Sequence, residues 1–256
     1  MGFLEKSGLK SAVIISVIFS FSCDEKIKYS EVTSNLILDI KEEYPDNKIS
    51  TPVLKLSIET EDYDECANYT LVTRGLMKSN SLRVDVVGSF LGYICFDAFG
   101  PATKSMELEG SIQKLILSKN GVSDEFIIEI TEDMVSIYPL SSIFASFNYS
   151  EYYRYPENSF AFLCGTFPED SVVCTQFEEI LLDNLSLVEF TFPVNGKQPY
   201  PNAPASYFKY QNPNDLATVG ALLKSFYNTN LIGKEGLGLT IIGWNNTRFR
   251  NDKQLN

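Results

Sequence analysis

The densest group of side chains that could bind a metal ion is the acidic run ETEDYDE at positions 59–65. Calcium prefers several carboxylate oxygens, so Glu61, Asp62 and Asp64 form a calcium candidate. The run lacks the Asp-x-Asp-x-Asp-Gly order of an EF-hand loop. We therefore favour a solvated acidic turn between two strands, and the sequence predicts no other metal site.

The chain contains no histidine, and this absence removes several chemistries. Ser-His-Asp and Cys-His catalysis, histidine-ligated zinc or haem, and imidazole acid–base chemistry all need that side chain. Gly233, Gly236 and Gly238 lack the spacing of a phosphate-binding loop and are interpreted as a turn into a strand. Carboxylates, a serine–lysine pair or calcium remain, but the sequence singles out no catalytic residue and no cofactor.

Five cysteines are present, and their positions indicate two roles. Cys23 follows an apolar segment, whereas the other four lie in the body of the chain. An even number in an exported protein favours two disulfides. The pairs Cys66–Cys95 and Cys164–Cys174 keep each bond within one expected domain, and buried free thiols are the alternative. No pair has Cys-x-x-Cys spacing, so a thioredoxin-like redox motif is absent.

Residues 1–22 have the order of an export signal peptide. Two lysines precede an uncharged, mostly apolar run at positions 11–21. This run is too short to cross a bilayer as a helix, which takes about 20 residues. It ends in the sequence SFSC at positions 20–23, followed at once by Asp24 and Glu25.

This ending resembles the signals of bacterial lipoproteins, in which small residues precede a cysteine. The resemblance implies that Cys23 takes a diacylglyceryl group and becomes the acylated N-terminus, with palmitate among the expected chains. Ser20 stands where that family prefers leucine, and such serine-rich boxes are similar to those of the Bacteroidetes group, where acidic residues after the cysteine can mark surface export. A secretory signal cut near Ser22 and an uncleaved anchor are the alternatives. We expect the outer membrane or cell surface, and otherwise a periplasmic or secreted protein.

Charge and length limit the partners and the number of domains. The formal net charge of the 256 residues is −12, and it becomes −13 once residues 1–22, with their net +1, are removed. An acidic surface repels phosphate groups, so we expect no nucleic acid partner. Membrane contact is expected through the lipid anchor, and a protein or a glycan remains open as a partner. The 234 residues that remain fit one large or two ordinary domains.

The elements that must position these residues begin with the polar segment 23–50. We interpret it as a lipidated tether, with the apolar patch Leu36–Ile40 as a candidate short strand. From 51 to 140, stretches in which apolar and polar residues alternate predict half-buried strands. Strands are expected at Leu54–Ile58, Tyr69–Thr73, Leu82–Val86, Gly92–Ala98, Met106–Leu108, Gln113–Ser118, Phe126–Ile130 and Val135–Pro139. Eight short strands at about ten-residue spacing predict an antiparallel, immunoglobulin-like β-sandwich.

Residues 141–158 are rich in aromatic side chains and are interpreted as a linker. An exposed platform that stacks on sugar rings or peptide is one interpretation. We favour packing between two domains or at the sandwich edge, because large aromatic side chains are mostly buried. The same interpretation applies to a second aromatic cluster, which comprises Tyr200, Tyr207, Phe208 and Tyr210.

From 159 to 247 the pattern alternates between strand and helix. Strands are expected at Ser159–Cys164, Leu187–Val194 and Leu237–Trp244, with helices that open near Asp170 and near Asn214 or Asp215. Four prolines predict a loop over 198–213, and 248–256 is a polar tail. This order predicts a small two-layer α+β domain, with a ferredoxin-like arrangement as one candidate. The expected fold class is mainly β plus α+β.

Three functions remain open. We favour a non-catalytic, membrane-tethered envelope lipoprotein that works by binding or as an accessory module, although the step from sandwich to binding is an analogy between folds. A carboxylate-dependent glycan hydrolase, with acids from the C-terminal domain, needs two facing carboxyl groups about 5 or about 6.5–9.5 Å apart. A structural subunit of an envelope assembly would present a long exposed strand edge or a large apolar patch.

Overall fold

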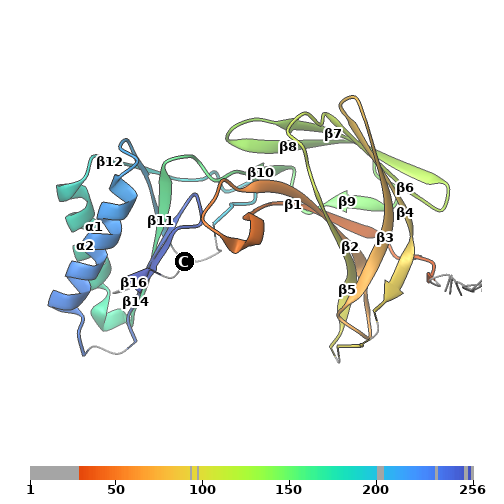
Figure 1. Ribbon diagram of the computed structural model, residues 1–256. Helices are drawn as coiled ribbons and strands as arrows, with labels where there is room; N and C mark the ends of the chain where they lie inside the picture. The colour runs from red at the N-terminus through yellow and green to blue at the C-terminus, as the bar shows by residue number, and fades with distance from the viewer. Residues whose placement is uncertain are drawn as a thin grey trace, which may run out of the picture.

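The computed structural model describes residues 29–92, 94–96, 98–200, 205–233, 236–250 and 253–254; the predicted signal peptide and Cys23 lie outside these described residues. Two sheets organise the chain. A ten-stranded sheet is followed by a six-stranded sheet that two helices cover (Figure 1). The fold class predicted from the sequence, mainly β plus α+β, is confirmed.

The large sheet has the order β10-β8-β7-β6-β4-β3-β5-β2-β1-β9. Its strands are β1 (Leu36–Glu43), β2 (Val53–Asp64), β3 (Tyr69–Lys78), β4 (Ser81–Leu91), β5 (Gly100–Glu107), β6 (Lys114–Lys119), β7 (Val122–Ile130), β8 (Met134–Ser141), β9 (Ala145–Phe147) and β10 (Glu151–Tyr153). Neighbours are antiparallel except for β1–β9, β3–β5 and β4–β6, which are parallel. The sheet is strongly curved (Figure 1), and its edge strands approach each other where the rings of Phe147 and Tyr152 make contact.

One continuous apolar core fills the inside of this curved sheet. The alternation that predicted β2 is confirmed, because Leu54, Leu56 and Ile58 all point into the core. Leu56 and Ile58 are fully buried, and each such side chain stabilises the fold by about 1.5–3 kcal/mol relative to an exposed one. The curved sheet thus encloses a core as the predicted sandwich would, but it is one continuous sheet, and three of its strand pairs are parallel rather than antiparallel.

Three boundaries in this part differ from the prediction. The tether interpretation of 23–50 is wrong from Leu36 onwards. The candidate short strand at Leu36–Ile40 is confirmed and continues to Glu43 as β1, which pairs with β2 along its whole length. The linker interpretation of 141–158 is wrong for β9 and β10, which are the two edge strands of the large sheet. The strand predicted at Gly92–Ala98 is wrong as well, since the described residues there form a loop.

The second sheet has the order β12-β13-β11-β14-β15-β16, and all its neighbours are antiparallel. Its elements are β11 (Ser159–Gly165), α1 (Val172–Asn184), β12 (Leu187–Phe190), β13 (Ala205–Tyr210), α2 (Asp215–Asn230), β14 (Gly238–Gly243), β15 (Arg248–Arg250) and β16 (Lys253–Gln254). In the chain α1 links β11 to β12, but in the sheet β13 lies between these two strands. The strands β11–β14 therefore have the split β-α-β order of the ferredoxin-like arrangement. That candidate arrangement is confirmed for β11–β14.

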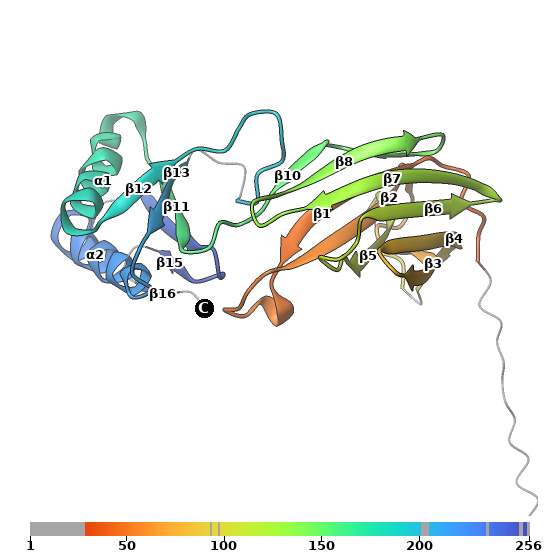
Figure 2. The same cartoon turned by 90° about the horizontal axis from the view of Figure 1, so that it is seen from above.

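Both helices cover the face of the small sheet that points away from the large sheet (Figure 2). Their apolar sides pack on Phe160 and Phe162 of β11, with Phe177 of α1 and Val219 and Leu223 of α2 fully buried between them. The periodicity that predicted the two helices is therefore confirmed. α1 begins at Val172, after a short 3-10 turn at Pro168–Asp170.

Two assignments in this domain were wrong. The loop predicted for 198–213 contains β13, in which Tyr207 and Phe208 are buried on opposite faces of the sheet, so the strand shows no alternation. The polar tail predicted for 248–256 contains β15 and β16, which extend the sheet beyond β14. Among the described residues, neither helix is long and apolar enough to cross a bilayer.

Candidate functional site

The two sheets meet at a junction built from the β1–β2 connection and the turn after β14. The hydroxyl of Tyr44 donates a hydrogen bond of 2.7 Å to the carbonyl of Trp244. The side-chain amide of Asn246 donates to the carbonyl of Asn47 at 3.1 Å. These bonds join residues some 200 positions apart in the chain and fix one sheet against the other.

Residues 154–158 join β10 to β11 and so connect the two sheets; we call this segment the connector. A buried ion pair holds it in place. The side chain of Glu42, at the end of β1, is only 2% exposed. Its Oε1 accepts a hydrogen bond of 2.9 Å from Nε of Arg154, and its Oε2 accepts one of 2.6 Å from the main-chain N–H of Tyr155. Arg154 also donates to the carbonyl of Thr131 at 2.8 Å. Both carboxylate oxygens are thus used to position the connector.

A cleft of about 320 Å³ opens beside this ion pair. Its volume lies at the lower end of the range for small-molecule sites, about 300–1,000 Å³. Its walls carry charges of both signs together with the aromatic rings of Tyr155 and Trp244. The lining residues are Glu42, Thr51, Pro52, Glu132, Asp133, Arg154, Tyr155, Pro156, Glu157, Lys209 and Trp244. Such a lining suits a polar ligand with an apolar face, such as a sugar or a peptide segment.

The tyrosines around the junction serve as hydrogen-bond donors. Burial, and next the nearby phenol of Tyr155, raises the pKa of Tyr44 far above its usual value. Burial is also the main cause that raises the pKa of Tyr155. The hydroxyl of Tyr155 donates to the carbonyl of Pro199 at 2.7 Å. Because these phenols keep their protons at neutral pH, neither supplies a base for catalysis.

Four aromatic residues of the predicted linker pack against the rest of the molecule, whereas Tyr149 is 43% exposed. Phe144 and Tyr152 are buried in the core of the large sheet, and Phe147 packs against it. Tyr155 contacts the ring of Tyr200 at a centroid distance of 4.8 Å. The packing interpretation is confirmed for these rings, and the exposed platform is wrong for them. The second cluster is buried too: Tyr200, Tyr207, Phe208 and Tyr210.

Trp244 combines a wall of the cleft with a structural role. Its ring is half-buried, and its indole N–H donates to the hydroxyl of Tyr210 at 3.1 Å. The indole edge is thereby oriented by the small sheet, while part of the ring remains available to the cleft. Sequence reasoning did not connect this side chain with Arg154, which lies some 90 positions earlier in the chain.

The four cysteines of the described chain form the two predicted disulfides. Cys66 pairs with Cys95 at a Cα–Cα distance of 5.2 Å, and Cys164 pairs with Cys174 at 5.8 Å. The second bond ties the end of β11 to the first turn of α1. The pairing predicted from the sequence is therefore confirmed, and the alternative of free thiols is wrong.

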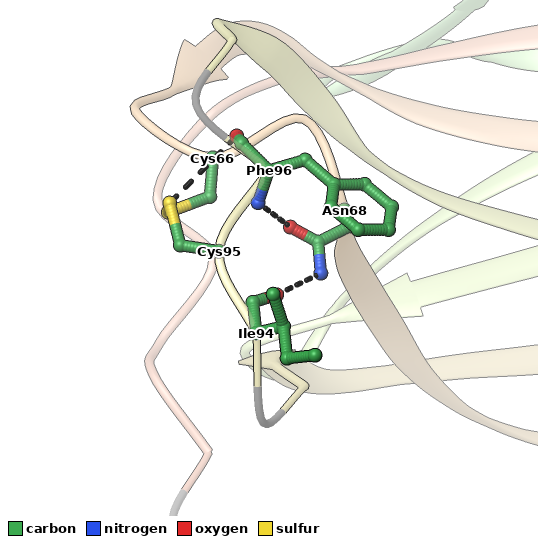
Figure 3. Close-up of a disulfide and its surroundings, with 5 residues drawn as sticks. All are labelled: Cys66, Asn68, Ile94, Cys95 and Phe96. Atoms are coloured by element: carbon green, nitrogen blue, oxygen red, sulfur yellow. Dashed lines mark hydrogen bonds between the residues drawn. A yellow bond between two sulfur atoms is a disulfide. The ribbon is translucent and has the colours of Figure 1, made fainter.

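The first disulfide shapes an exposed loop between β4 and β5, which we call the disulfide loop and define by the described residues Gly92, Ile94–Phe96, Ala98 and Phe99 (Figure 3). Asn68 holds this loop with both ends of its side-chain amide. Its Nδ2 donates to the carbonyl of Ile94 at 2.6 Å, and its Oδ1 accepts from the N–H of Phe96 at 3.0 Å. The main chain of the loop is thus fixed on either side of Cys95.

The acidic run is not assembled into a metal site. Among the described residues, no three carboxylate or cysteine side chains are grouped so that they could hold a metal ion. Glu61 accepts a hydrogen bond from the amide of Asn35 at 3.0 Å. Burial, followed by the charges of Asp62 and Glu65, raises the pKa of Asp64 above its usual value. The geometry therefore gives the calcium candidate no support.

No family model, no curated protein and no solved structure matches this chain.

Proposed function

We propose that this chain is a lipid-anchored protein of the bacterial envelope, acylated at Cys23, that acts as a non-catalytic binding or accessory module at the outer membrane or cell surface. The lipoprotein-like end of the signal segment supports the anchor. The two disulfides support an oxidising compartment outside the cytoplasm, where such bonds persist.

The positions of the chain entry and of the cleft support a display role. Ser30 forms a bridge with Ser89 near the end of β4, so the described chain joins the large sheet at that end. The last residue of β2, Asp64, lies at this same end of the sheet, because β3 begins there and pairs with the end of β4. Thr51 and Pro52, which line the cleft, lie at the opposite end of β2. The 12 residues of β2 span about 40 Å, at about 3.3 Å per residue. A protein anchored through Cys23 would hold the cleft well away from the lipid.

The groups at the cleft favour binding over catalysis. The buried carboxylate of Glu42 already uses both oxygens in structural bonds. The nearby phenols stay protonated. Glu157, Lys209 and the ring of Trp244 are the kinds of groups that recognise a polar ligand without reacting with it. This use of Glu42 is the observation on which the non-catalytic proposal rests.

One observation favours the hydrolase as a second candidate. Glu132, Asp133 and Glu157 all line the cleft, and pairs of carboxylates are the machinery of glycoside hydrolysis. These residues come from the β7–β8 turn and the connector, whereas the hydrolase hypothesis drew its acids from the C-terminal domain. Release of reducing ends from an envelope glycan, abolished by Glu157→Gln or Asp133→Asn, would replace the binding proposal with this one.

Metabolic labelling with a fatty-acid analogue tests the anchor. The full chain is expressed in a bacterium that processes lipoproteins, beside Cys23→Ala and the matched control Ser22→Ala. We expect label and membrane fractionation for the wild type and for Ser22→Ala, but no label for Cys23→Ala. An unlabelled, soluble wild-type protein would overturn the lipoprotein proposal.

Ligand binding tests the cleft. The full chain is titrated with sugars and peptides from an envelope digest, and Trp244 emission reports on occupancy because this single tryptophan lines the cleft. Lys209→Gln removes a charge from the cleft, whereas Lys78→Gln changes an exposed lysine at the end of β3 and serves as the control. We expect Lys209→Gln alone to weaken binding; equal affinity in both variants would remove the cleft from the proposal.

A further inference from the structure

The disulfide loop lies beside the point where the chain enters the large sheet. Ser30 and Ser89 exchange both main-chain hydrogen bonds, at 2.8 and 2.9 Å. The entering chain packs so closely on β4 that a Cβ atom added to Gly88 would lie 2.8 Å from the Cβ of Tyr29. Because β4 ends at Leu91 and the loop follows directly, the entering chain and the loop share one end of the sheet.

The distance from the proposed anchor to this end of the sheet is short. Tyr29 follows Cys23 by six residues, and six residues span at most about 20 Å even when fully extended. With the acyl chains of Cys23 in a bilayer, Tyr29 is therefore held within about 20 Å of the lipid surface. The disulfide loop is confined to the same neighbourhood.

This end of the sheet carries large apolar side chains on its surface. Phe99 is 79% exposed, Ile94 69% and Phe96 60%, and Tyr63 at the end of β2 is 69% exposed. Tyr29 itself is 46% exposed. Exposed apolar groups of this kind mark contact surfaces, and the disulfide and Asn68 hold the loop in place, so little conformational freedom is lost when it makes a contact.

We propose that the disulfide loop inserts Ile94, Phe96 and Phe99 into the lipid surface next to the anchor, so that the protein stands upright with its cleft directed outwards. This proposal rests on the lipid anchor proposed above. Tyrosine and phenylalanine are suited to the boundary between headgroups and acyl chains. The link through Cys23 adds a high effective concentration, so a weak loop–lipid contact suffices.

The charges around the loop specify the kind of lipid surface. Asp62, Asp64 and Glu65 lie next to Tyr63 in the same end segment of the chain, and they repel anionic headgroups. The contact is therefore apolar and suits a zwitterionic surface. Addition of anionic lipid is expected to weaken it, in contrast to the docking of a basic patch.

Quenching by brominated lipid tests the proposal on the full-length, lipid-processed protein. It is reconstituted into phosphatidylcholine vesicles with and without bromine on the acyl chains. The native Trp244 lies at the far junction and gives an internal reference. Phe96→Trp adds a reporter on the loop, and Val194→Trp adds a matched reporter at a fully exposed position of the C-terminal domain.

We expect brominated lipid to reduce the added emission of Phe96→Trp at least twofold, since interfacial groups sit about 5–10 Å into the headgroup boundary. The added emission of Val194→Trp should be unchanged. Anionic lipid should lower the quenching of Phe96→Trp. Equal emission with and without bromine would overturn the proposal. So would blue-shifted but unquenched emission in whole envelopes, which would show that a protein covers the loop.

A parallel fatty-acid label separates this proposal from the anchor. Labelled protein with an unquenched loop overturns the loop contact and leaves the anchor intact. Unlabelled protein whose loop is still quenched by added vesicles removes the anchor and supports the loop contact. Unlabelled protein with an unquenched loop overturns both.

Discussion

Loss of the buried ion pair between Glu42 and Arg154 should destabilise the protein more than loss of an exposed pair. Truncation of one partner in a buried pair costs about 3–5 kcal/mol, because the other charge stays buried without compensation. Arg154 is 26% exposed, whereas Glu42 is 2% exposed. Arg154→Ala thus leaves the deeper charge behind with one hydrogen bond, from the N–H of Tyr155. We expect a loss of about 3 kcal/mol, at the lower end of that range.

Urea unfolding measures this loss, with circular dichroism as the probe of the whole fold and Trp244 emission as the probe of the junction. The matched control is Arg83→Ala, which removes an exposed partner of Asp85 at a distance of 3.2 Å. Exposed pairs contribute about 0–1 kcal/mol, so this control should shift the unfolding midpoint very little. The double variant Arg154→Ala with Glu42→Gln should lose less than the sum of the two single changes, because no unpaired charge remains buried.

A loss for Arg154→Ala that equals the loss for Arg83→Ala would refute this reasoning. Strict additivity in the double variant would refute it as well, because it would mean that the two side chains do not interact across the connector.

Three further predictions concern pH, the disulfide and the core. Burial is the main cause that raises the pKa of Tyr44, Tyr152 and Tyr200. The folded protein therefore keeps phenol protons that the unfolded chain loses above about pH 10. The free energy of unfolding should fall as pH rises beyond that point, by about 1.4 kcal/mol per pH unit for each phenol. Urea midpoints that are equal at pH 9 and pH 11 would contradict this. Cys66→Ala with Cys95→Ala opens a loop between cysteines 29 residues apart and should cost about 3–4 kcal/mol, with faster proteolysis after β4 as the local sign; unchanged cleavage would argue against a fixed loop. Leu56→Ala should cost about 2–5 kcal/mol because Leu56 is fully buried, whereas Leu76→Ala at a 62% exposed position should have little effect on the thermal midpoint.

The sequence predicted those parts of the fold that carry a local signal. Alternation of apolar residues predicted β2, β4 and β7, and helical periodicity predicted α1 and α2. Cysteine number and domain membership predicted the disulfide pairs. β13 could not be found this way, because it buries side chains on both faces and follows closely spaced prolines. The disulfide loop carried a misleading signal, since Ile94, Phe96 and Ala98 alternate as they would in a strand.

The candidate site was beyond sequence reasoning for a different reason. Glu42 and Arg154 are 112 positions apart, and Trp244 comes from a third part of the chain. Nothing in a local pattern indicates that a charge at the end of β1 meets the connector after β10. The acidic run, by contrast, was conspicuous in the sequence. Among the described residues it forms no metal site, and Glu61 accepts a hydrogen bond from the amide of Asn35 instead.

The most direct test of the central claim is mass spectrometry of the mature N-terminus after expression of the full chain in a lipoprotein-processing bacterium. We predict that the first residue is Cys23 and that it carries a diacylglyceryl group. A mature chain that begins at another residue, or an unmodified cysteine at that position, would contradict it.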